Sequence, residues 1–283
     1  MVWGRVKNKL EILRELIRGY DSCLVAYSGG VDSAFLACVA AEELGSRALA
    51  VIADSPSLPR RELEEAVTLA EARKFPLRVV RTREFDNPAY LANPGNRCYF
   101  CKHELFVELK DLARDEGFAV IAYGENMSDI GDYRPGAQAA SEFSVRAPLK
   151  DAGLTKEEIR RFSAEMGLPT AEKPQMACLS SRIPHGEAVT PEKLGMIERG
   201  ERVLRDAGFF DVRVRHHEIK AGGLARIEVG AGELARFFEA GRMEAVAGAF
   251  REIGYAQVTL DLQGYRRGSL GLNQTIAFGP AHK

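Results

Sequence analysis

Two features of this sequence are suited to chemistry: a glycine-rich turn near the N-terminus and a set of cysteines. Residues 28–33 read SGGVDS and follow an apolar run at residues 23–27. The two glycines allow a sharp bend and a close approach of the backbone to a ligand, and Ser28 and Ser33 add hydroxyl groups. An amphipathic segment, residues 34–44, comes next, so the order reads strand, turn, helix. Free N–H groups at the helix start favour an anion, although the turn lacks the Gly-Lys-Ser/Thr of a Walker A loop.

The five cysteines fall into two groups. Cys23 and Cys38 lie among apolar residues and are predicted to be small buried hydrophobic side chains. Cys98 and Cys101 have Cys-x-x-Cys spacing at the predicted start of a helix, where the dipole and the neighbouring Arg97 and Lys102 favour the thiolate.

The third cysteine of the second group, Cys178, lies in a loop segment, residues 176–186 (MACLSSRIPHG), close to Arg182. A Cys-x-x-Cys pair by itself is compatible with a redox pair or with half of a zinc site, which His103 or His185 could complete. Three cysteines also suit a 4Fe–4S cluster with one iron left open, where a hydrosulfide nucleophile could be carried.

Length and composition indicate a globular protein. The 283 residues suffice for one large domain or two modest ones, and 46% are hydrophobic. A formal net charge of −1 gives no general attraction to nucleic acid or to an anionic membrane. We find no apolar stretch long enough to span a bilayer and no signal-peptide core, and an odd number of cysteines disfavours a disulfide framework. The predicted location is the cytoplasm.

Apolar strands alternate with helical patterns over the first 170 residues. Strands are predicted at 23–27, 48–53, 77–82 and 120–123, and helices at 7–18, 33–44, 60–73, 102–116 and 155–166. This alternation indicates an α/β fold with a parallel sheet and crossover helices. Ligands bind beyond the carboxyl ends of such strands, so the glycine turn, residues 53–55 and residues 123–126 are predicted to line one crevice.

A proline-rich segment separates this region from a different pattern. Residues 203–214 and 249–260 form a weak internal repeat, each reading helix end, glycine, aromatic residue and strand. With a strand at 224–229 and a helix at 233–250, the order suggests a small α+β domain of ferredoxin-like type. We therefore expect a first domain at 1–170, a cysteine-bearing active-site loop at 171–190, and a domain for substrate binding or oligomerisation at 191–283.

The glycine turn resembles the PP-loop of ATP pyrophosphatases, a Rossmann-like fold also termed adenine nucleotide alpha hydrolase-like. These enzymes release pyrophosphate and leave AMP on a carboxylate or carbonyl oxygen. Taken together, several segments resemble the LarE family of ATP-dependent sulfur transferases over nearly the whole chain. They are residues 28–33, 53–55, 97–102, 124–126, 132–136 (DYRPG), 178–186 and 258–269 (VTLDLQGYRRGS).

This resemblance implies a specific activity. LarE enzymes adenylate the carboxylates of a pyridinium-3,5-dicarboxylate mononucleotide and convert them to thiocarboxylates, during biosynthesis of the nickel-pincer nucleotide cofactor of lactate racemase. Some members sacrifice the sulfur of the cysteine equivalent to Cys178, and others hold a 4Fe–4S cluster with three cysteines and use external sulfide. Because Cys98, Cys101 and Cys178 are all present here, the cluster-bearing type is predicted. The resemblance further implies a sulfide source, other nickel-pincer biosynthesis proteins as partners, and a homo-oligomer, a hexamer in this family.

The chemistry of the residues agrees with adenylation. Asp32 and a polyphosphate are both negative, so Mg²⁺ between them is the sensible arrangement, and Arg182 could neutralise phosphate charge unless it forms a surface ion pair. The predicted catalytic residues are Cys178, Asp32 and Arg182, and the predicted metal ligands are Cys98, Cys101 and Cys178. ATP and substrate contacts are predicted at Ala26, Ser28, Gly29, Gly30, Asp32, Ser33, Asp54, Ser55, Gly124, Arg213, Arg215 and Glu201.

The C-terminal domain offers basic residues for a phosphorylated substrate. Arg213 and Arg215 alternate along a predicted strand and so share one face, where a pair of guanidinium groups could bind phosphate. Arg226 and Arg266 are further candidates, and a solvated polar sheet face is the alternative. Glu228 is a nearby acidic residue, while the metal or substrate contact at Glu201 is implied by the family alone.

Three other functions are compatible with parts of the pattern. A tRNA thiolation enzyme would combine a PP-loop with cysteine-bound clusters, but the near-neutral charge and the lack of a basic-aromatic platform disfavour RNA. An amide ligase of the NAD-synthetase type would use ammonia and need no cysteine cluster. A nucleotide-sensing module would bind ATP without turnover and leaves the cysteines unexplained.

Overall fold

The chain divides into two compact units. The computed structural model describes residues 2–131, 135–174 and 177–266. One unit comprises Met1–Asn87 and Asn96–Ala177, and the other comprises Pro88–Gly95 and Cys178–Lys283. The short segment Pro88–Gly95, which falls inside the range expected for the first domain, thus packs with the C-terminal unit.

A parallel sheet forms the centre of the first unit, as the sequence predicts. Its strands are β1 (Cys23–Ala26), β2 (Ala48–Asp54), β3 (Leu77–Arg81) and β4 (Val120–Tyr123). They lie in the order β3-β2-β1-β4, and every neighbouring pair is parallel. This arrangement confirms the α/β fold and puts the carboxyl ends of β1 and β4 side by side.

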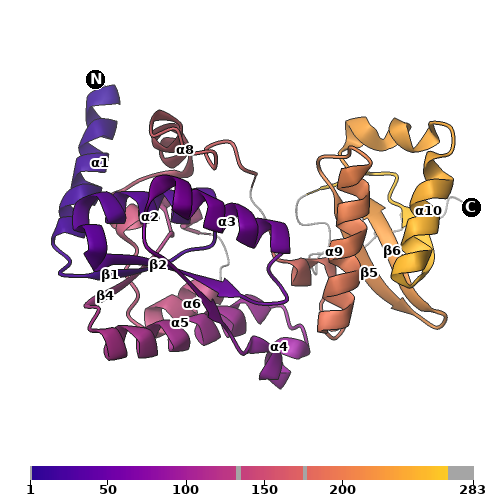
Figure 1. The fold of residues 1–283 in the computed structure, drawn as a ribbon, viewed down its shortest axis with the longest axis horizontal. Coiled ribbons are helices and arrows are strands. Elements are labelled where there is room, and N and C mark those ends of the chain that lie inside the picture. The colour runs from indigo at the N-terminus through magenta and orange to yellow at the C-terminus, as the bar shows by residue number, and fades with distance from the viewer. Residues whose placement is uncertain (1, 132–134, 175–176, 267–283) are drawn as a thin grey trace, which may run out of the picture. The chain divides into compact units, whose positions relative to one another are not determined.

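Helices cover both faces of this sheet (Figure 1). Side chains of β1 alternate between the two resulting cores: Val25 packs with α2 and α3, and Leu24 packs with α5 and α6. This alternation explains why the strand is apolar throughout. The helices of the unit are α1 (Val2–Arg18), α2 (Val31–Leu44), α3 (Arg60–Arg73), α5 (Arg97–Glu116), α6 (Pro135–Glu142), α7 (Pro148–Asp151) and α8 (Lys156–Glu165).

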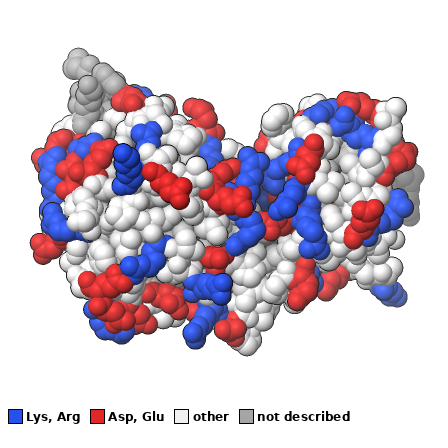
Figure 2. Space-filling view, viewed as in Figure 1, with Lys and Arg blue, Asp and Glu red and all other residues white. Residues whose placement is uncertain are grey.

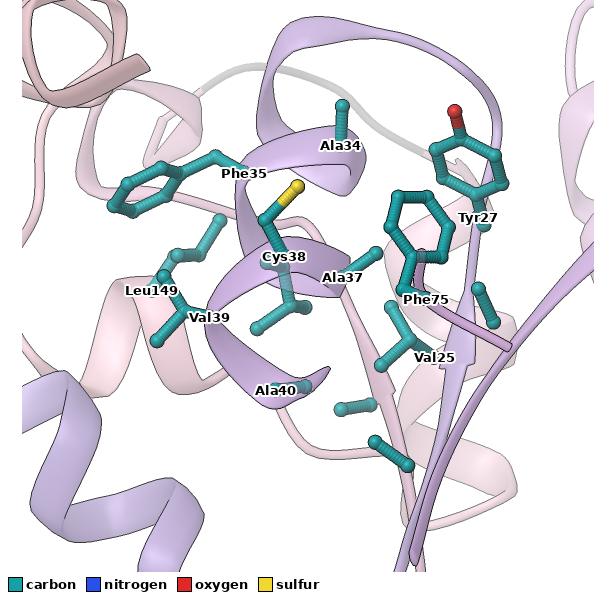
Figure 3. Packing of buried hydrophobic residues seen from close by; sticks show 14 of the residues in the cluster. Val25, Tyr27, Ala34, Phe35, Ala37, Cys38, Val39, Ala40, Phe75 and Leu149 are labelled. Atoms are coloured by element: carbon teal, nitrogen blue, oxygen red, sulfur yellow. The ribbon is translucent and has the colours of Figure 1, made fainter. Parts of the chain in front are cut away.

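Cys23 and Cys38 belong to this interior. Figure 3 shows Cys38 on α2 among Phe35, Ala37 and Val39, and its exposed fraction is 6%. Burial raises the pKa of the Cys38 thiol to about 11 and that of Cys23 to about 12. The prediction that these two cysteines act as buried hydrophobic side chains is confirmed.

The second unit is built on a three-stranded sheet. Its elements are α4 (Pro88–Leu91), α9 (Pro191–Asp206), β5 (Arg213–Ile219), β6 (Gly222–Glu228), α10 (Arg242–Ile253) and β7 (Tyr255–Leu260). The strands β5 and β6 are antiparallel, and β7 joins β6 in parallel. A Cβ on Gly200 of α9 would lie 3.0 Å from the Phe250 ring and 3.4 Å from Val214 Cγ2, so a glycine lets α9 approach both α10 and β5.

One predicted helix of this unit is wrong in extent. The pattern at 233–250 is divided into a 3-10 segment, η5 (Ala231–Phe238), and α10. Gly241 stands between them with a φ of 76°, a left-handed conformation that interrupts a regular helix and suits glycine. The two repeat copies do match the structure, because α9 and α10 are each followed by a glycine of positive φ and then by a strand.

Charges of both signs intermingle on each unit (Figure 2). Many form ion pairs, such as Arg14 with Glu42 and Arg114 with Asp111. In the described part of the chain, none of the helices has the length and apolar character needed to cross a membrane.

Candidate active site

The glycine turn joins β1 to α2 through a network of short polar contacts. The Ser28 N–H donates to Ser33 Oγ at 3.1 Å, the two serine hydroxyl oxygens lie 3.0 Å apart, and Ser33 Oγ donates to the Gly30 carbonyl at 3.2 Å. Gly29 has a φ of 71°, and a Cβ there would meet the Ala66 Cβ of α3 at 2.9 Å. The turn is therefore fixed in a shape that only glycine allows at position 29.

The end of β4 packs against the start of α2. A Cβ on Gly124 would lie 3.0 Å from the Ser33 backbone nitrogen and 3.1 Å from Asp32 Cβ. Because Gly30, the N-cap residue of α2, has no side chain with which to cap the helix, the first N–H groups of α2 remain suited to an external anion.

A cleft opens at this edge of the sheet. It holds about 690 Å³ of empty space, open solvent at its mouth included. Among the described residues, its lining comprises Ala26, Ser28, Gly30, Asp32, Ser33, Lys102, Tyr123, Gly124, Glu125, Asp129, Gly136 and Ala137. Six of the predicted ATP contacts thus line one cleft, while Gly29 shapes the turn behind it.

Asp32 is the acidic group of this turn. Its Oδ2 accepts a hydrogen bond from Lys156 Nζ in an ion pair, and its Oδ1 is buried with no hydrogen-bond partner among the residues that the structure describes. An unsatisfied carboxylate oxygen beside an anion-binding helix start fits Mg²⁺, which prefers carboxylate and phosphate oxygens. The residues present are therefore compatible with a magnesium ion held by Asp32.

The end of β2 takes no part in the lining of the cleft. Asp54 forms an ion pair with Arg60, and the Ser55 hydroxyl lies 2.7 Å from that of Ser57. The expectation that three strand ends line one crevice holds for β1 and β4, and contacts of Asp54 and Ser55 with a nucleotide stay a prediction.

Cys98 and Cys101 lie in the first turn and a half of α5, which begins at Arg97. That start is five residues before the predicted one, because residues 97–101 (RCYFC) join the helix that follows them. Cys98 is exposed and Cys101 is half-buried. Their spacing of three puts both thiols on one side of the helix, at its positive end.

Cys178 begins a turn in the second unit, and several hydrogen bonds fix this turn. It precedes the 3-10 segment η4 (Leu179–Arg182), and its carbonyl oxygen accepts from Ser181 Oγ at 2.7 Å and from an Arg182 guanidinium nitrogen at 3.0 Å. The Arg215 guanidinium donates to the Ser181 carbonyl at 3.0 Å, and the Tyr90 and Ser180 hydroxyls lie 2.8 Å apart. Hydrogen bonds from β5 and from the Pro88–Gly95 segment therefore fix this turn.

Arg182 is not part of a surface ion pair. Its side chain is fully buried, and Nε donates to Glu201 Oε1 at 2.8 Å. Glu201 is also paired with Arg205 at 2.9 Å. Burial alone would raise the pKa of Glu201, but the surrounding guanidinium charges outweigh it and hold the pKa below its usual value. In this arrangement Arg182 supports the Cys178 turn, and its action on phosphate stays a prediction.

Arg213 and Arg215 share one face of the sheet, opposite the face that packs on α9. They are 7% and 6% exposed, so this is not a solvated polar surface. The Arg215 guanidinium donates twice to Glu228 Oε2, at 2.9 and 2.8 Å, and Arg226 pairs with the other oxygen at 3.2 Å. Arg213 stacks over the Tyr265 ring at 4.7 Å, whereas Arg266 is exposed.

The three cysteines of the predicted cluster site are divided between the two units. Among the residues that the structure describes, no three His, Cys, Asp or Glu side chains form a group that could hold a metal ion. Cys98 and Cys101 belong to the first unit and Cys178 to the second. Residues 132–134 of the segment 132–136 and residues 267–269 of the segment 258–269 lie outside the described residues.

Two lysines, one lining the cleft and one paired with Asp32, were not predicted to belong to the site. Lys102 lines the cleft beside Gly136 of α6, where a Cβ would meet the Lys102 Cγ at 2.9 Å, and its Nζ lies over the Phe106 ring, 5.8 Å from the ring centroid. Two features of the sequence could have indicated this position: Lys102 directly follows Cys101, and Gly136 in segment 132–136 leaves room for its side chain. Lys156 reaches Asp32 from 124 residues away, and no local pattern indicates this contact.

Comparison with known proteins places this geometry in a wider group. No protein-family model matches the chain. It is 31% identical over 270 residues to the pyridinium-3,5-bisthiocarboxylic acid mononucleotide synthase of Lactiplantibacillus plantarum, with 95% of each chain covered. An uncharacterised protein of Synechocystis is 44% identical over 265 residues, 94% of this chain and 97% of the relative. A subunit of the glutamine-hydrolysing GMP synthase of Pyrococcus furiosus is 25% identical over 222 residues, 72% of this chain and 69% of the relative.

The parallel sheet, the glycine turn between β1 and α2, and the similarity to GMP synthase define an ATP-using enzyme of the PP-loop class. Within this class, the family follows from the similarity to the Lactiplantibacillus plantarum synthase over almost the full length of both chains. The chain belongs to the LarE-like family of PP-loop enzymes.

Proposed function

We propose that this enzyme is an ATP-dependent sulfur transferase acting on a pyridinium-3,5-dicarboxylate mononucleotide. It adenylates a carboxylate of this substrate and converts it to a thiocarboxylate, with release of AMP and pyrophosphate, as one step in making a nickel-pincer nucleotide cofactor. The supporting observation is the cleft at the glycine turn, present in a chain that is 31% identical over nearly its whole length to a synthase named for the bisthiocarboxylic acid mononucleotide.

Adenylation assigns a role to each side of the cleft. A carboxylate is a poor acyl donor because its leaving group would be oxide, so its oxygen attacks the α-phosphorus of ATP and pyrophosphate departs. The N–H groups at the start of α2, the Ser28 and Ser33 hydroxyls and the Lys102 ammonium would hold the departing anion. A magnesium ion held by Asp32 would offset the charge between this carboxylate and the polyphosphate.

Sulfur chemistry is assigned to the cysteines. We propose that Cys98, Cys101 and Cys178 together ligate a 4Fe–4S cluster, since thiolates are its usual ligands. Such a cluster, when bound, would supply sulfide from an external source to the acyl adenylate. The protein's part is to present the thiols: the positive end of α5 favours thiolates at Cys98 and Cys101, and Arg182 fixes the backbone of Cys178.

The substrate phosphate is assigned to the basic face of the second unit. Arg213 and Arg215 lie on one strand face with Arg226, and their charge exceeds that of Glu228, which pairs with Arg215 and Arg226. A phosphate monoester carries the complementary charge. The side chains of Arg213 and Arg215 are already ordered, so little rotamer entropy would be lost on binding.

The test measures adenylation and thiolation separately. We expect exchange of labelled pyrophosphate into ATP only when the dicarboxylate mononucleotide is present, and a thiocarboxylate product, identified by mass spectrometry, when sulfide is added to anaerobically reconstituted protein. Iron content and absorbance of that protein report on the cluster. Exchange supported by tRNA, ammonia-dependent amide formation, or no exchange with any substrate would overturn the proposal in favour of the corresponding alternative function.

Cysteine variants separate the two sulfur sources. Cys98→Ala and Cys178→Ala should abolish iron binding and thiolation but leave pyrophosphate exchange intact. Cys38→Ala is the matched control, because its thiol is buried among apolar residues and should not affect iron. A colourless protein that thiolates once per chain, with loss of hydrogen sulfide from Cys178, would contradict the cluster and indicate a sacrificed cysteine.

Two further expectations belong to this proposal. We propose that the enzyme acts in the cytoplasm beside other proteins of nickel-pincer cofactor biosynthesis, and that it assembles as a homo-oligomer. Light scattering of the full chain should give a mass several times 31.1 kDa. A monomeric mass would refute the oligomer without touching the assignment of the reaction.

A further inference from the structure

The ion pair between Lys156 and Asp32 occupies the acidic group of the nucleotide cleft. Lys156 Nζ donates to Asp32 Oδ2, and the two side chains are 30% and 21% exposed, so the contact is shielded but reachable by solvent. Asp32 Oδ1 is buried and, within the described part of the chain, lacks a hydrogen-bond partner. The carboxylate is thus satisfied at one oxygen only, with its second oxygen available as a ligand.

Lys156 is placed by the fold rather than by its own flexibility. It is the first residue of α8, and its backbone N–H donates to Ser128 Oγ at 3.0 Å, while Thr155 caps the helix through the Glu158 N–H. Further along α8, the Phe162 ring stacks on Phe35 of α2 with centroids 6.1 Å apart. The packing of α8 on α2 therefore brings the start of α8 to the start of α2.

The contact offsets the negative charge of Asp32, which would otherwise repel a polyphosphate. The start of α2 attracts anions, but the carboxylate of Asp32 in its first turn repels a polyphosphate. A cation on Asp32 removes that repulsion. Lys156 supplies a positive charge from within the chain at the position where a divalent cation would also bind.

We infer that Lys156 is a displaceable counter-ion of Asp32. It neutralises the carboxylate in the nucleotide-free enzyme and gives up this contact when a divalent cation binds there. This inference rests on the proposed use of magnesium–ATP at the cleft. Because ammonium and metal compete for one carboxylate, their binding is linked, and each lowers the apparent affinity of the other.

Metal binding to the nucleotide-free protein tests the competition directly. Mn²⁺, followed by electron paramagnetic resonance, is the probe. Lys156→Gln should bind Mn²⁺ roughly 1.5- to 5-fold more tightly than the wild type, the range expected for loss of a partly exposed ion pair. Lys156→Arg should stay near the wild type, and Asp32→Asn should lose the site. Lys9→Gln is the matched control: it removes a charge paired with Glu158 of the same helix and should leave Mn²⁺ affinity unchanged.

A second measurement uses α,β-methylene-ATP in the presence of EDTA. Without metal, Lys156→Gln should bind this analogue several-fold more weakly than Lys9→Gln, since only the former leaves Asp32 uncompensated. Unchanged or weaker Mn²⁺ binding in Lys156→Gln would overturn the inference, as would metal-free analogue binding equal to that of Lys9→Gln. Neither readout involves sulfur transfer, so an enzyme that fails to thiolate the mononucleotide would refute the proposed function and leave this result standing.

Discussion

The guanidinium of Arg182 links Glu201 to Cys178. It donates to Glu201 Oε1 at 2.8 Å and to the carbonyl oxygen of Cys178 at 3.0 Å, and both charged side chains are at most 1% exposed. The cysteine predicted to take part in sulfur chemistry is thus tied to a buried ion pair. A surface arginine could not hold a loop in this way, because solvent would compete for its hydrogen bonds.

Removal of one partner of this pair should destabilise the second unit strongly. Glu201→Gln leaves Arg182 and Arg205 without their shared carboxylate, and loss of one partner of a buried pair costs about 3–5 kcal/mol. Urea unfolding followed by circular dichroism measures the change. Asp111→Asn is the control, since its pair with Arg114 is exposed and screened by solvent, so its loss should leave the unfolding free energy nearly unchanged. Equal losses for the two variants would contradict the buried role.

Stability should depend on pH through His216. This side chain is 3% exposed, and burial, with a smaller contribution from the Lys193 charge, lowers its pKa from 6.5 to about 4. Between these values the unfolded chain binds a proton that the folded chain does not, so stability falls as pH drops from 6.5 towards 4. The loss from this group is at most about 3 kcal/mol at 1.36 kcal/mol per pKa unit.

A His216→Phe variant isolates this effect. Phenylalanine keeps a ring beside Tyr255 but cannot titrate, so its unfolding free energy should change less than that of the wild type between pH 7 and pH 4.5. The exposed His185→Gln variant should retain the wild-type slope. Parallel pH profiles for the wild type and His216→Phe would rule out the assignment.

Gly124→Ala should weaken nucleotide binding more than it weakens the fold. The new methyl group would lie 3.0 Å from the Ser33 nitrogen, which must shift at the start of α2. We expect ATP affinity, measured by calorimetry, to fall about tenfold or more because the anion-binding N–H groups lose their alignment. Gly248→Ala, in open space on α10, should bind ATP normally and gain about 0.5–1 kcal/mol of stability.

Thiol reactivity should follow burial. At pH 8, iodoacetamide should label Cys98, Cys101 and Cys178 in iron-free protein well before Cys23 and Cys38, whose thiols are buried and have raised pKa values. Peptide mass spectrometry resolves the order. Early labelling of Cys38 in folded protein would show that the α2 core opens more readily than its packing indicates.

The sequence by itself determined the features that depend on neighbouring residues. Alternating apolar strands and helices predicted the parallel sheet, and the SGGVDS turn predicted a tight loop at a helix start. Apolar surroundings predicted the burial of Cys23 and Cys38. Such patterns are local, because backbone preference and side-chain periodicity act over a few residues.

Tertiary structure decided which distant charges meet. Lys156 reaches Asp32 only because α8 packs on α2, and Arg182 is buried only because α9 brings Glu201 against the Cys178 turn. The arginines of β5 could equally have formed a solvated face, and contact with Glu228 on β6 is what buries Arg215. The strength of such ion pairs depends on the distance between the charges and on their exposure to solvent, which only the packed chain sets. Spacing along the sequence indicates neither quantity.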